Sequence, residues 1–183
     1  MNIKALQDVL KNSDQLFSDQ DVEHALDRMA KQMNDRLQDS LPLFLCVLNG
    51  AVIPMGRLLC RLDFPLETDY IHATRYRGET EGAELHWKAY PSTSLKDRTV
   101  VLVDDIFDEG LTLKALVEHC YKEGAEQVLT AVLVNKLHDR KAELQMDFVG
   151  LEAEDRYLFG CGMDYREYWR NAPGIYAIRE EKK

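Results

Sequence analysis

The sequence predicts an α/β domain built on a mainly parallel sheet flanked by helices. Apolar runs of strand length occur at residues 43–48, 99–103 and 128–134, and segments of helical periodicity lie between them. A continuous apolar run is typical of a strand that is buried on both faces, as in a parallel sheet covered by helices. Alternating strands and helices of this kind are joined by right-handed crossovers.

The N-terminal part of the chain contains one clear helix. Apolar residues recur at helical spacing over residues 19–38. Ser18, followed three residues later by Asp21, has the pattern of a capping box with Asp in place of the usual Glu. We expect this helix to serve packing.

A helix, a strand and a loop are expected between the first and second apolar runs. A helix is expected over residues 52–62 and a strand over 67–74. Residues 76–98 have no long apolar run and contain two glycines, a proline and many charges. This composition predicts a mobile loop, in which residues 84–90 form a strand of a projecting hairpin.

The second half of the chain predicts further strands and one helix. The helix spans residues 111–122 and ends before Gly124, a residue that favours helix C-termini. Short strands are expected at residues 148–151, 157–159 and 175–178. No internal repeat, low-complexity tract or linker divides the chain, so we expect one domain over residues 1–183.

Composition narrows the classes of function. The formal net charge of −9 disfavours a general nucleic-acid-binding protein, which needs clustered Lys and Arg to contact phosphates. The chain has neither a run of about 18 apolar residues nor a signal-peptide pattern, so we expect no membrane partner and a cytoplasmic location. The four cysteines are far apart in the sequence and are expected to be reduced thiols rather than zinc ligands.

An acidic cluster after the second apolar run is the most informative pattern. Asp104 and Asp105 come at the carboxyl end of that strand, the edge where open parallel sheets bind ligands. The paired carboxylates can accept hydrogen bonds from vicinal ribose hydroxyls or help to hold hydrated Mg²⁺. Asp108 could act as a general acid or base. Gly110 allows a tight turn, and Thr112 adds a hydroxyl beside helix amides that can bind phosphate.

A solvated acidic turn with a helix cap is the alternative for each of these acids taken singly. Together they place four negative charges in one turn, because Glu109 lies directly after Asp108. Their mutual repulsion favours a ligand that compensates it, such as a cation or a polyhydroxyl compound.

The segment VLVDDIFDEGLT, residues 101–112, resembles the phosphoribosyl pyrophosphate (PRPP) motif of type I phosphoribosyltransferases. From about residue 42 to 178 the chain is similar to the hypoxanthine-guanine phosphoribosyltransferase group. The resemblance implies the type I phosphoribosyltransferase fold. Its core would span residues of about 40–150, with a flexible loop and a small base-binding hood made of N-terminal helices and residues 151–183.

The resemblance also implies roles for the main motif. Asp104 and Asp105 would hold the ribose hydroxyls and contribute to a Mg²⁺ site, and Asp108 would handle the proton at purine N7. The 5′-phosphate would be bound by the four residues Glu109, Gly110, Leu111 and Thr112. Glu109 departs from the Thr or Ser of most relatives, so we expect its carboxylate to point away or to cap the following helix.

Two weaker motifs would serve pyrophosphate and loop closure. Asn49 and Gly50 are similar to the family's pyrophosphate loop, which binds through backbone amides and often contains a cis peptide; Asn49 replaces a common Lys or Arg. Arg75 and Tyr76 resemble the start of the flexible loop that excludes water. Arg75 replaces a Ser and could bind pyrophosphate. Without the resemblance, these residues would be a simple turn and a packed surface aromatic.

The C-terminal motifs would bind the base. Lys136 matches a residue that donates to the purine 6-oxo group, Tyr157 one that stacks on the purine, and Leu158 one whose backbone meets the purine edge. Asp164 matches a Mg²⁺-associated carboxylate, and Arg170 a pyrophosphate contact. A solvated Lys and an aromatic packing layer are the alternatives on sequence alone.

The implied reaction transfers phosphoribose from PRPP to hypoxanthine or guanine, giving IMP or GMP and pyrophosphate with Mg²⁺ as cofactor. Family resemblance also implies a homodimer or homotetramer. A nucleotide-sensing RNA-binding regulator with the same fold is the main alternative, and the acidic charge disfavours it. A phospho-acceptor receiver domain agrees less well with this sequence. In receiver domains the paired acids follow the first strand of a shorter chain, whereas Asp104 and Asp105 come after residue 100 here.

Overall fold

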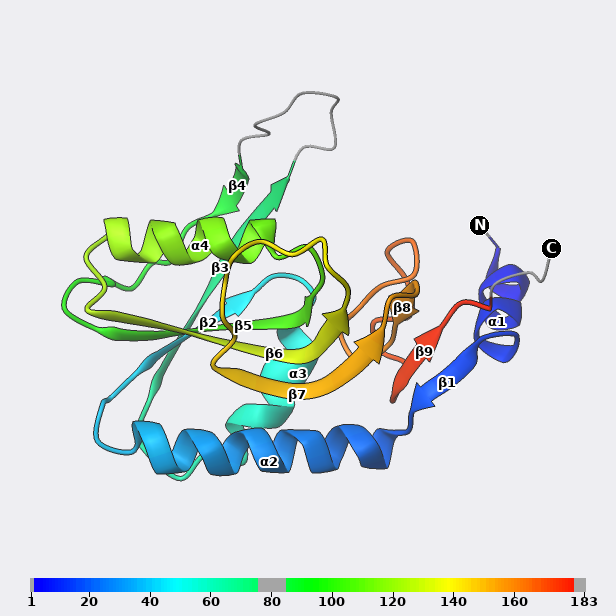
Figure 1. The fold of residues 1–183 in the computed structure, drawn as a ribbon, viewed down its shortest axis with the longest axis horizontal. Helices are drawn as coiled ribbons and strands as arrows, with labels where there is room; N and C mark the ends of the chain where they lie inside the picture. The colour runs from blue at the N-terminus through cyan, green and yellow to red at the C-terminus, as the bar shows by residue number, and fades with distance from the viewer. Residues whose placement is uncertain (1, 76–84, 180–183) are drawn as a thin grey trace.

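The structure, a computed structural model, describes residues 2–75 and 85–179 and contains two sheets (Figure 1). The larger sheet has six strands in the order β4-β3-β2-β5-β6-β7. Its strands are β2 (Leu43–Val47), β3 (Glu67–Arg75), β4 (Leu85–Ala89), β5 (Thr99–Phe107), β6 (Gln127–Leu137) and β7 (Phe148–Glu154). All neighbours pair in parallel except β4, which pairs antiparallel with β3. The predicted fold class and the hairpin strand are therefore confirmed.

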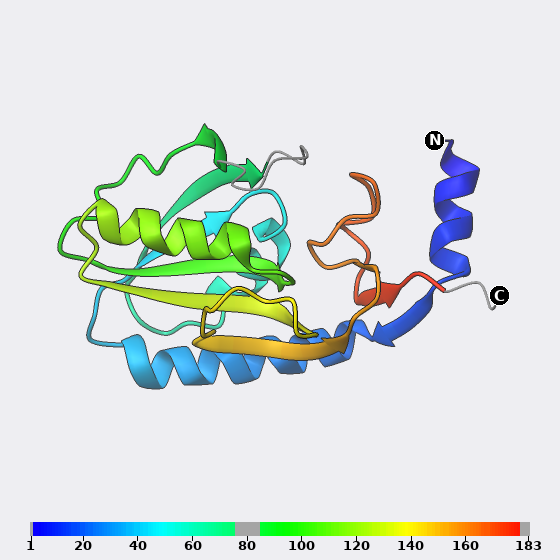
Figure 2. The same ribbon diagram turned by 45° about the horizontal axis from the view of Figure 1, so that its top comes forward.

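Helices cover both faces of this sheet (Figures 1 and 2). Helix α4 (Leu111–Lys122) contacts β3, β5 and β6, whereas α3 (Val52–Leu59) contacts β2 and β5. Helix α2 (Asp19–Leu37) packs against β7 and α3. The core between these layers is apolar, and each fully buried Leu, Met or Phe stabilises the fold by about 1.5–3 kcal/mol.

The start of α2 confirms the predicted capping box. The Asp21 amide donates to Ser18 Oγ at 3.2 Å, and the Ser18 amide donates to Asp21 Oδ2 at 2.8 Å. These bonds satisfy amides that have no partner within the helix. The buried face of α2 then follows the apolar periodicity, with Met29 and Met33 at most 1% exposed.

A second, three-stranded sheet lies beyond the carboxyl ends of β6 and β7 (Figure 1). Its order is β1 (Asp14–Phe17), β9 (Ile175–Ala177), β8 (Leu158–Phe159), all antiparallel. Ion pairs connect β1 to both other strands, because Asp14 accepts from Arg156, just before β8, at 2.6 Å and from Arg179, just after β9, at 2.8 Å. Helix α1 (Ile3–Lys11) precedes β1 and has no buried residue. Periodicity predicted neither α1 nor β1, although the resemblance implied N-terminal helices without giving their bounds.

Several element bounds differ from the prediction. Strands β5 and β6 are longer than their apolar runs, since their ladder continues through Asp104↔Val132 to Phe107↔Asn135. Lys136 therefore lies inside β6 rather than after it. The polar side chains at the carboxyl ends of β5 and β6 do not interrupt the pairing of these strands, because backbone groups make the hydrogen bonds between them. Strand β8 omits Tyr157. Of the predicted mobile loop over residues 76–98, residues 76–84 lie outside the described residues, whereas residues 85–98 include β4.

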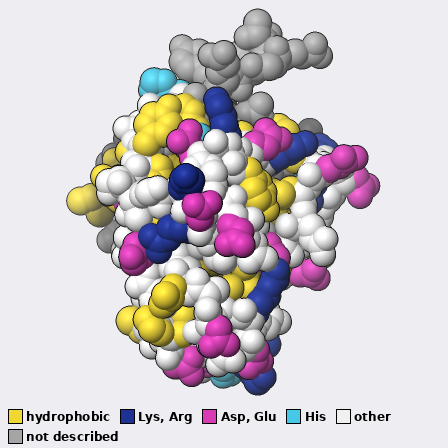
Figure 3. All heavy atoms as spheres, turned by 90° about the vertical axis from the view of Figure 1, so that its left-hand side faces the viewer, with side chains coloured by type: hydrophobic (Ala, Val, Ile, Leu, Met, Phe, Trp, Pro, Cys, Tyr) yellow, Lys and Arg dark blue, Asp and Glu magenta, His cyan; other side chains and the backbone are white. Residues whose placement is uncertain are grey.

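The end of the molecule opposite the small sheet has a mixed surface. Figure 3 shows acidic and basic side chains interspersed with hydrophobic ones on this face. Among the described residues, no helix is both long enough and apolar enough to cross a membrane.

Candidate active site

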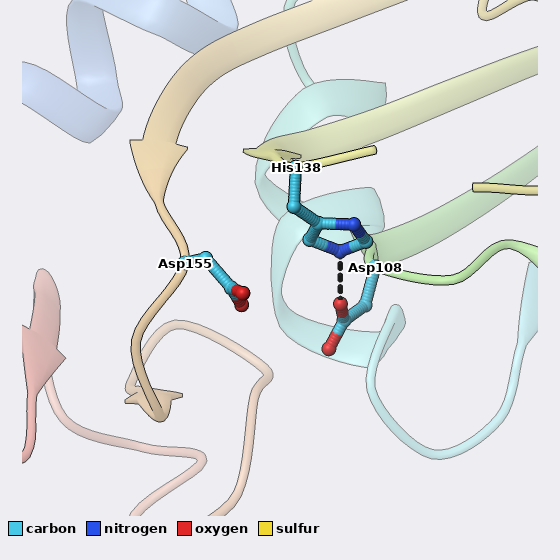
Figure 4. Close-up of side chains that lie close together, drawn as sticks. All are labelled: Asp108, His138 and Asp155. Atoms are coloured by element: carbon cyan, nitrogen blue, oxygen red, sulfur yellow. Dashed lines mark hydrogen bonds and ion pairs between the residues drawn. The ribbon is translucent and has the colours of Figure 1, made fainter. Parts of the chain in front are cut away.

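Three parallel strands end side by side and present a polar residue directly after each end. Asp108 follows β5, His138 follows β6 and Asp155 follows β7 (Figure 4). Parallel neighbours point their carboxyl ends to one edge of the sheet, so these side chains converge there. Asp108 was predicted as a site residue, whereas His138 and Asp155 were not.

Hydrogen bonds and ion pairs join these side chains to Lys136. Lys136 Nζ donates to Asp108 Oδ2 at 2.9 Å and pairs with Asp155 Oδ1 at 3.1 Å. His138 Nε2 lies 2.6 Å from Asp108 Oδ1. The Arg140 guanidinium donates to Asp155 Oδ2 at 2.7 Å, and the Arg140 amide donates to His138 Nδ1 at 3.1 Å. We call these five residues the Asp108 ring, because the contacts form a closed loop.

The ring keeps its carboxylates charged. Burial alone would raise the pKa of Asp108, but hydrogen bonds from Lys136 and His138 outweigh burial, and the pKa is lowered. Hydrogen bonds from Arg140 and Lys136 likewise lower the pKa of Asp155. The site therefore offers a carboxylate acceptor beside an ammonium donor whose side chain is only 11% exposed.

The ring is a poor site for Mg²⁺. Asp108, His138 and Asp155 place ligand atoms within 4.8 Å of one another. However, the Lys136 ammonium already contacts both carboxylates, and Mg²⁺ prefers oxygen ligands over imidazole nitrogen.

Asp104 and Asp105 form a second carboxylate group, inside β5. Burial and the neighbouring charge of Asp105 raise the pKa of Asp104 well above its usual value, and burial raises the pKa of Asp105. The Arg170 guanidinium lies near this pair, with Nη1 3.9 Å from Asp105 Oδ2. Asp105 is buried and Asp104 is half-buried. A repelling pair of this kind fits a divalent cation or ribose hydroxyls, either of which would compensate the carboxylates.

Three segments far apart in the sequence meet at Asp105. A Cβ atom built on Gly50 would lie 2.1 Å from Asp105 Oδ2, and one built on Gly162 would lie 2.3 Å from the Gly50 carbonyl oxygen and 3.1 Å from Asp105 Cβ. The Leu48–Asn49 peptide is cis, as the resemblance implies. The close approach requires glycine at both positions and brings the predicted pyrophosphate loop against the acidic pair.

The turn between Asp108 and α4 presents helix amides. Gly110 is the N-cap of α4 with a positive φ of 74°, and no side chain caps the helix. A Cβ there would also lie 2.1 Å from the Phe107 ring. Glu109 is exposed and does not cap α4; its carbonyl accepts from the Ala142 amide at 2.8 Å. Amides at a helix start with no side-chain partner are suited to bind an anion.

The C-terminal segment carries the remaining predicted residues. The side chain of Arg170 donates to the Gly162 carbonyl at 2.7 Å and to Asp164 Oδ1 at 2.8 Å, while Asp164 Oδ2 accepts from the Glu167 amide. Tyr157 is 51% exposed, and its hydroxyl donates to the Asp164 carbonyl at 3.3 Å. An exposed ring of this kind can stack on a flat ligand.

Comparisons with known proteins agree with this architecture. Residues 12–166 match the phosphoribosyl transferase domain family. The chain is 32% identical to the hypoxanthine-guanine phosphoribosyltransferase of Bacillus subtilis over 165 residues, which cover 90% of this chain and 92% of that protein. It is 31% identical to the hypoxanthine-guanine-xanthine phosphoribosyltransferase of Tritrichomonas foetus over 90% of this chain and 91% of that protein.

The chain belongs to the hypoxanthine-guanine phosphoribosyltransferase family. A solved structure of a hypoxanthine phosphoribosyltransferase from Staphylococcus aureus superimposes with a TM-score of 0.88 at 26% identity, covering 98% of this chain and 96% of that one. The protein is therefore a phosphoribosyltransferase of purine salvage with the type I fold.

The phosphoribosyltransferase structure brings some predicted site residues together and leaves others apart. Asp104, Asp105, Gly50 and Arg170 lie in one group, and Lys136 joins Asp108 in the ring. Tyr157 joins the first group through Asp164, which accepts from both the Tyr157 hydroxyl and the Arg170 guanidinium. For Arg75 the structure describes only the backbone, at the end of β3, and Tyr76 lies outside the described residues. If the predicted strand had been extended to Leu137, where β6 ends, His138 would have followed a strand end and would have been a candidate site residue.

Proposed function

We propose that this phosphoribosyltransferase transfers the 5-phosphoribosyl group of PRPP to hypoxanthine or guanine, giving IMP or GMP and pyrophosphate. The observation that carries the choice of base is the adjacent pair of Lys136 and Asp108. A 6-oxopurine presents an acceptor, O6, next to a donor, N7–H. An ammonium beside a carboxylate complements that edge, whereas the 6-amino group of adenine would face the ammonium with a second donor.

Residues of the acidic pair and the α4 turn would bind PRPP. Asp104 and Asp105 would accept hydrogen bonds from the ribose hydroxyls, and the backbone amides of residues 109–112 would hold the 5′-phosphate. The exposed Glu109 side chain supports this arrangement, since an inward carboxylate would repel phosphate. Backbone amides at Asn49 and Gly50 and the side chains of Arg75 and Arg170 would bind pyrophosphate.

The reaction exchanges one bond at the ribose anomeric carbon. The C1′–O bond to pyrophosphate breaks with its electron pair on the leaving oxygen, and purine N9 donates the pair that forms the C1′–N9 bond. Asp108 accepts the proton from N7, so that the product base is neutral. Tyr157 would stack on the ring, Leu158 would offer its backbone to the purine edge, and the loop containing Tyr76 would exclude water. Positioning and charge stabilisation supply most of the acceleration.

Mg²⁺ fits the acidic pair better than the Asp108 ring. Asp104 and Asp105 are oxygen ligands whose charged forms are disfavoured by burial and, for Asp104, by the neighbouring charge of Asp105, so both pKa values are raised. Asp164 could contribute if Arg170 released one of its oxygens. When bound, Mg²⁺ would neutralise and orient the leaving pyrophosphate.

Steady-state kinetics with PRPP, Mg²⁺ and each of hypoxanthine, guanine, xanthine and adenine test the proposal. We expect turnover with hypoxanthine and guanine and kcat/KM for adenine lower by at least about 10⁴-fold, the discrimination typical of a buried hydrogen-bonding site. Comparable rates with adenine would contradict the role of Lys136.

We expect a cytoplasmic enzyme that forms a homodimer or homotetramer, which mass measurement in solution would test. An RNA-shift assay would test the alternative of an RNA-binding regulator. The interspersed charges on the face in Figure 3 do not favour that alternative.

A further inference from the structure

We infer that His138 is a positioning residue that holds one oxygen of Asp108, so that the other oxygen is available to the purine. The inference rests on the proposed function, because it concerns the same carboxylate. It starts from the Asp108 ring, in which both Asp108 oxygens have partners: Oδ1 faces His138 at 2.6 Å and Oδ2 accepts from Lys136 at 2.9 Å.

The geometry determines the tautomer of His138. The Arg140 amide donates to Nδ1 at 3.1 Å, so Nδ1 must carry a lone pair rather than a proton. The ring proton is therefore on Nε2, and Nε2–H donates to Asp108 Oδ1. The imidazole is a neutral donor, and its side chain is only 5% exposed, which restricts its rotation.

The two partners of Asp108 differ in how easily they can leave. His138 is held by a backbone amide at one nitrogen and by Asp108 at the other. Lys136 has a flexible side chain and a second carboxylate partner, Asp155, at 3.1 Å. When a 6-oxopurine enters, Lys136 can therefore leave Oδ2 and donate to O6 while it stays paired with Asp155. Asp108 Oδ2 is then free to accept from N7–H.

Asp155 and Arg140 complete this arrangement from the neighbouring strand end. The Arg140 guanidinium donates to Asp155 Oδ2 at 2.7 Å, which leaves Oδ1 directed at Lys136. The charged or titratable groups in contact with Asp108 are Lys136 and His138, and Asp155 and Arg140 lie one contact further away. The Lys141 ammonium also interacts electrostatically with Asp108 without a hydrogen bond to it. Without His138, Asp108 would have only the partner that must leave, and its carboxylate could rotate away from N7.

Replacement of His138 by alanine and by glutamine tests this role. His138→Ala removes the donor, whereas the side-chain amide of His138→Gln can place an N–H near the position of Nε2. We expect His138→Ala to lower kcat roughly ten- to one-hundred-fold, the effect of losing a hydrogen bond to a charged group, with the KM for PRPP nearly unchanged. His138→Gln should restore most of the turnover.

The pH profile separates positioning from packing. The hydrogen bond from His138 lowers the pKa of Asp108, so His138→Ala should move the acidic limb of kcat/KM for the purine to higher pH. His138→Gln should keep the limb near its wild-type position. His24→Ala, on the exposed surface of α2, is the matched control and should change neither quantity.

Several results would overturn the inference. Wild-type kcat and an unmoved acidic limb in His138→Ala would show that Asp108 needs no such partner. Equal losses in His138→Ala and His138→Gln, with lower thermal stability and an unmoved limb, would show a packing role only. If the wild-type enzyme itself formed no nucleotide from PRPP and any purine, the proposed function would fail instead.

Discussion

An alanine at position 50 would place its methyl group inside the carboxyl group of Asp105. The Cβ atom would lie 2.1 Å from Oδ2, 2.3 Å from Cγ and 2.6 Å from Oδ1. Such distances are shorter than any real contact of a Cβ atom, so either the Asp105 side chain or the backbone at residue 50 must move. Asp105 is only 8% exposed, which leaves its side chain little space.

Both stability and substrate binding should respond to Gly50→Ala. Overpacking of a well-packed site costs about 1–3 kcal/mol of unfolding free energy. For a chain of this length, each kcal/mol corresponds to a melting temperature lower by about 2–4 °C. Displacement of Asp105 should also raise the KM for PRPP roughly ten- to one-hundred-fold, as expected when hydrogen bonds to a charged group are lost.

Gly56→Ala is the matched control within α3. A Cβ atom at Gly56 meets nothing within 4 Å, and alanine favours the helix by about 0.5–1 kcal/mol. This variant should melt slightly higher and keep wild-type kinetics. The melting temperature and the KM for PRPP should be measured for both variants and compared with those of the wild-type enzyme. A Gly50→Ala enzyme with the wild-type KM for PRPP would refute the role of the contact between Gly50 and Asp105.

Three further substitutions test individual carboxylates. Asp108→Asn should lower kcat by about 10²–10⁴-fold with PRPP affinity nearly unchanged, and equal loss of both in steady-state kinetics would argue against its role with the N7 proton. Glu109→Thr should leave the KM for PRPP unchanged or lower it, because the exposed carboxylate only repels phosphate; a collapse of affinity would show that the side chain binds substrate. Asp104→Asn should raise the free energy of unfolding at neutral pH by about 1 kcal/mol while it impairs PRPP binding, the trade-off expected of a strained functional site. Because the raised pKa of Asp104 destabilises the folded state only above the unfolded value of 3.8, this gain should grow as the pH rises and vanish below that value in pH-dependent melting experiments.

Local patterns in the sequence determined most of the core. Helix α4 begins and ends at the predicted residues, and the capping box of α2 forms as predicted, because both depend on residues a few positions apart. The acids of the PRPP motif could likewise be identified along a single segment. Periodicity missed helix α1 and strand β1, since α1 buries nothing and β1 is stabilised by its pairing with β9, more than 150 residues away in the sequence.

Only the tertiary structure decided which side chains share a site. Asp108, His138 and Asp155 are separated by 30 and 17 residues, and nothing local to any one of them indicates the others. Parallel pairing of β5, β6 and β7 brings them together, because it sets the register that aligns the three strand ends. The same is true of Gly50 and Asp105, whose contact depends on β2 lying beside β5. The sequence thus specified the chemical groups and the elements that carry them, while packing of distant segments determined which groups touch.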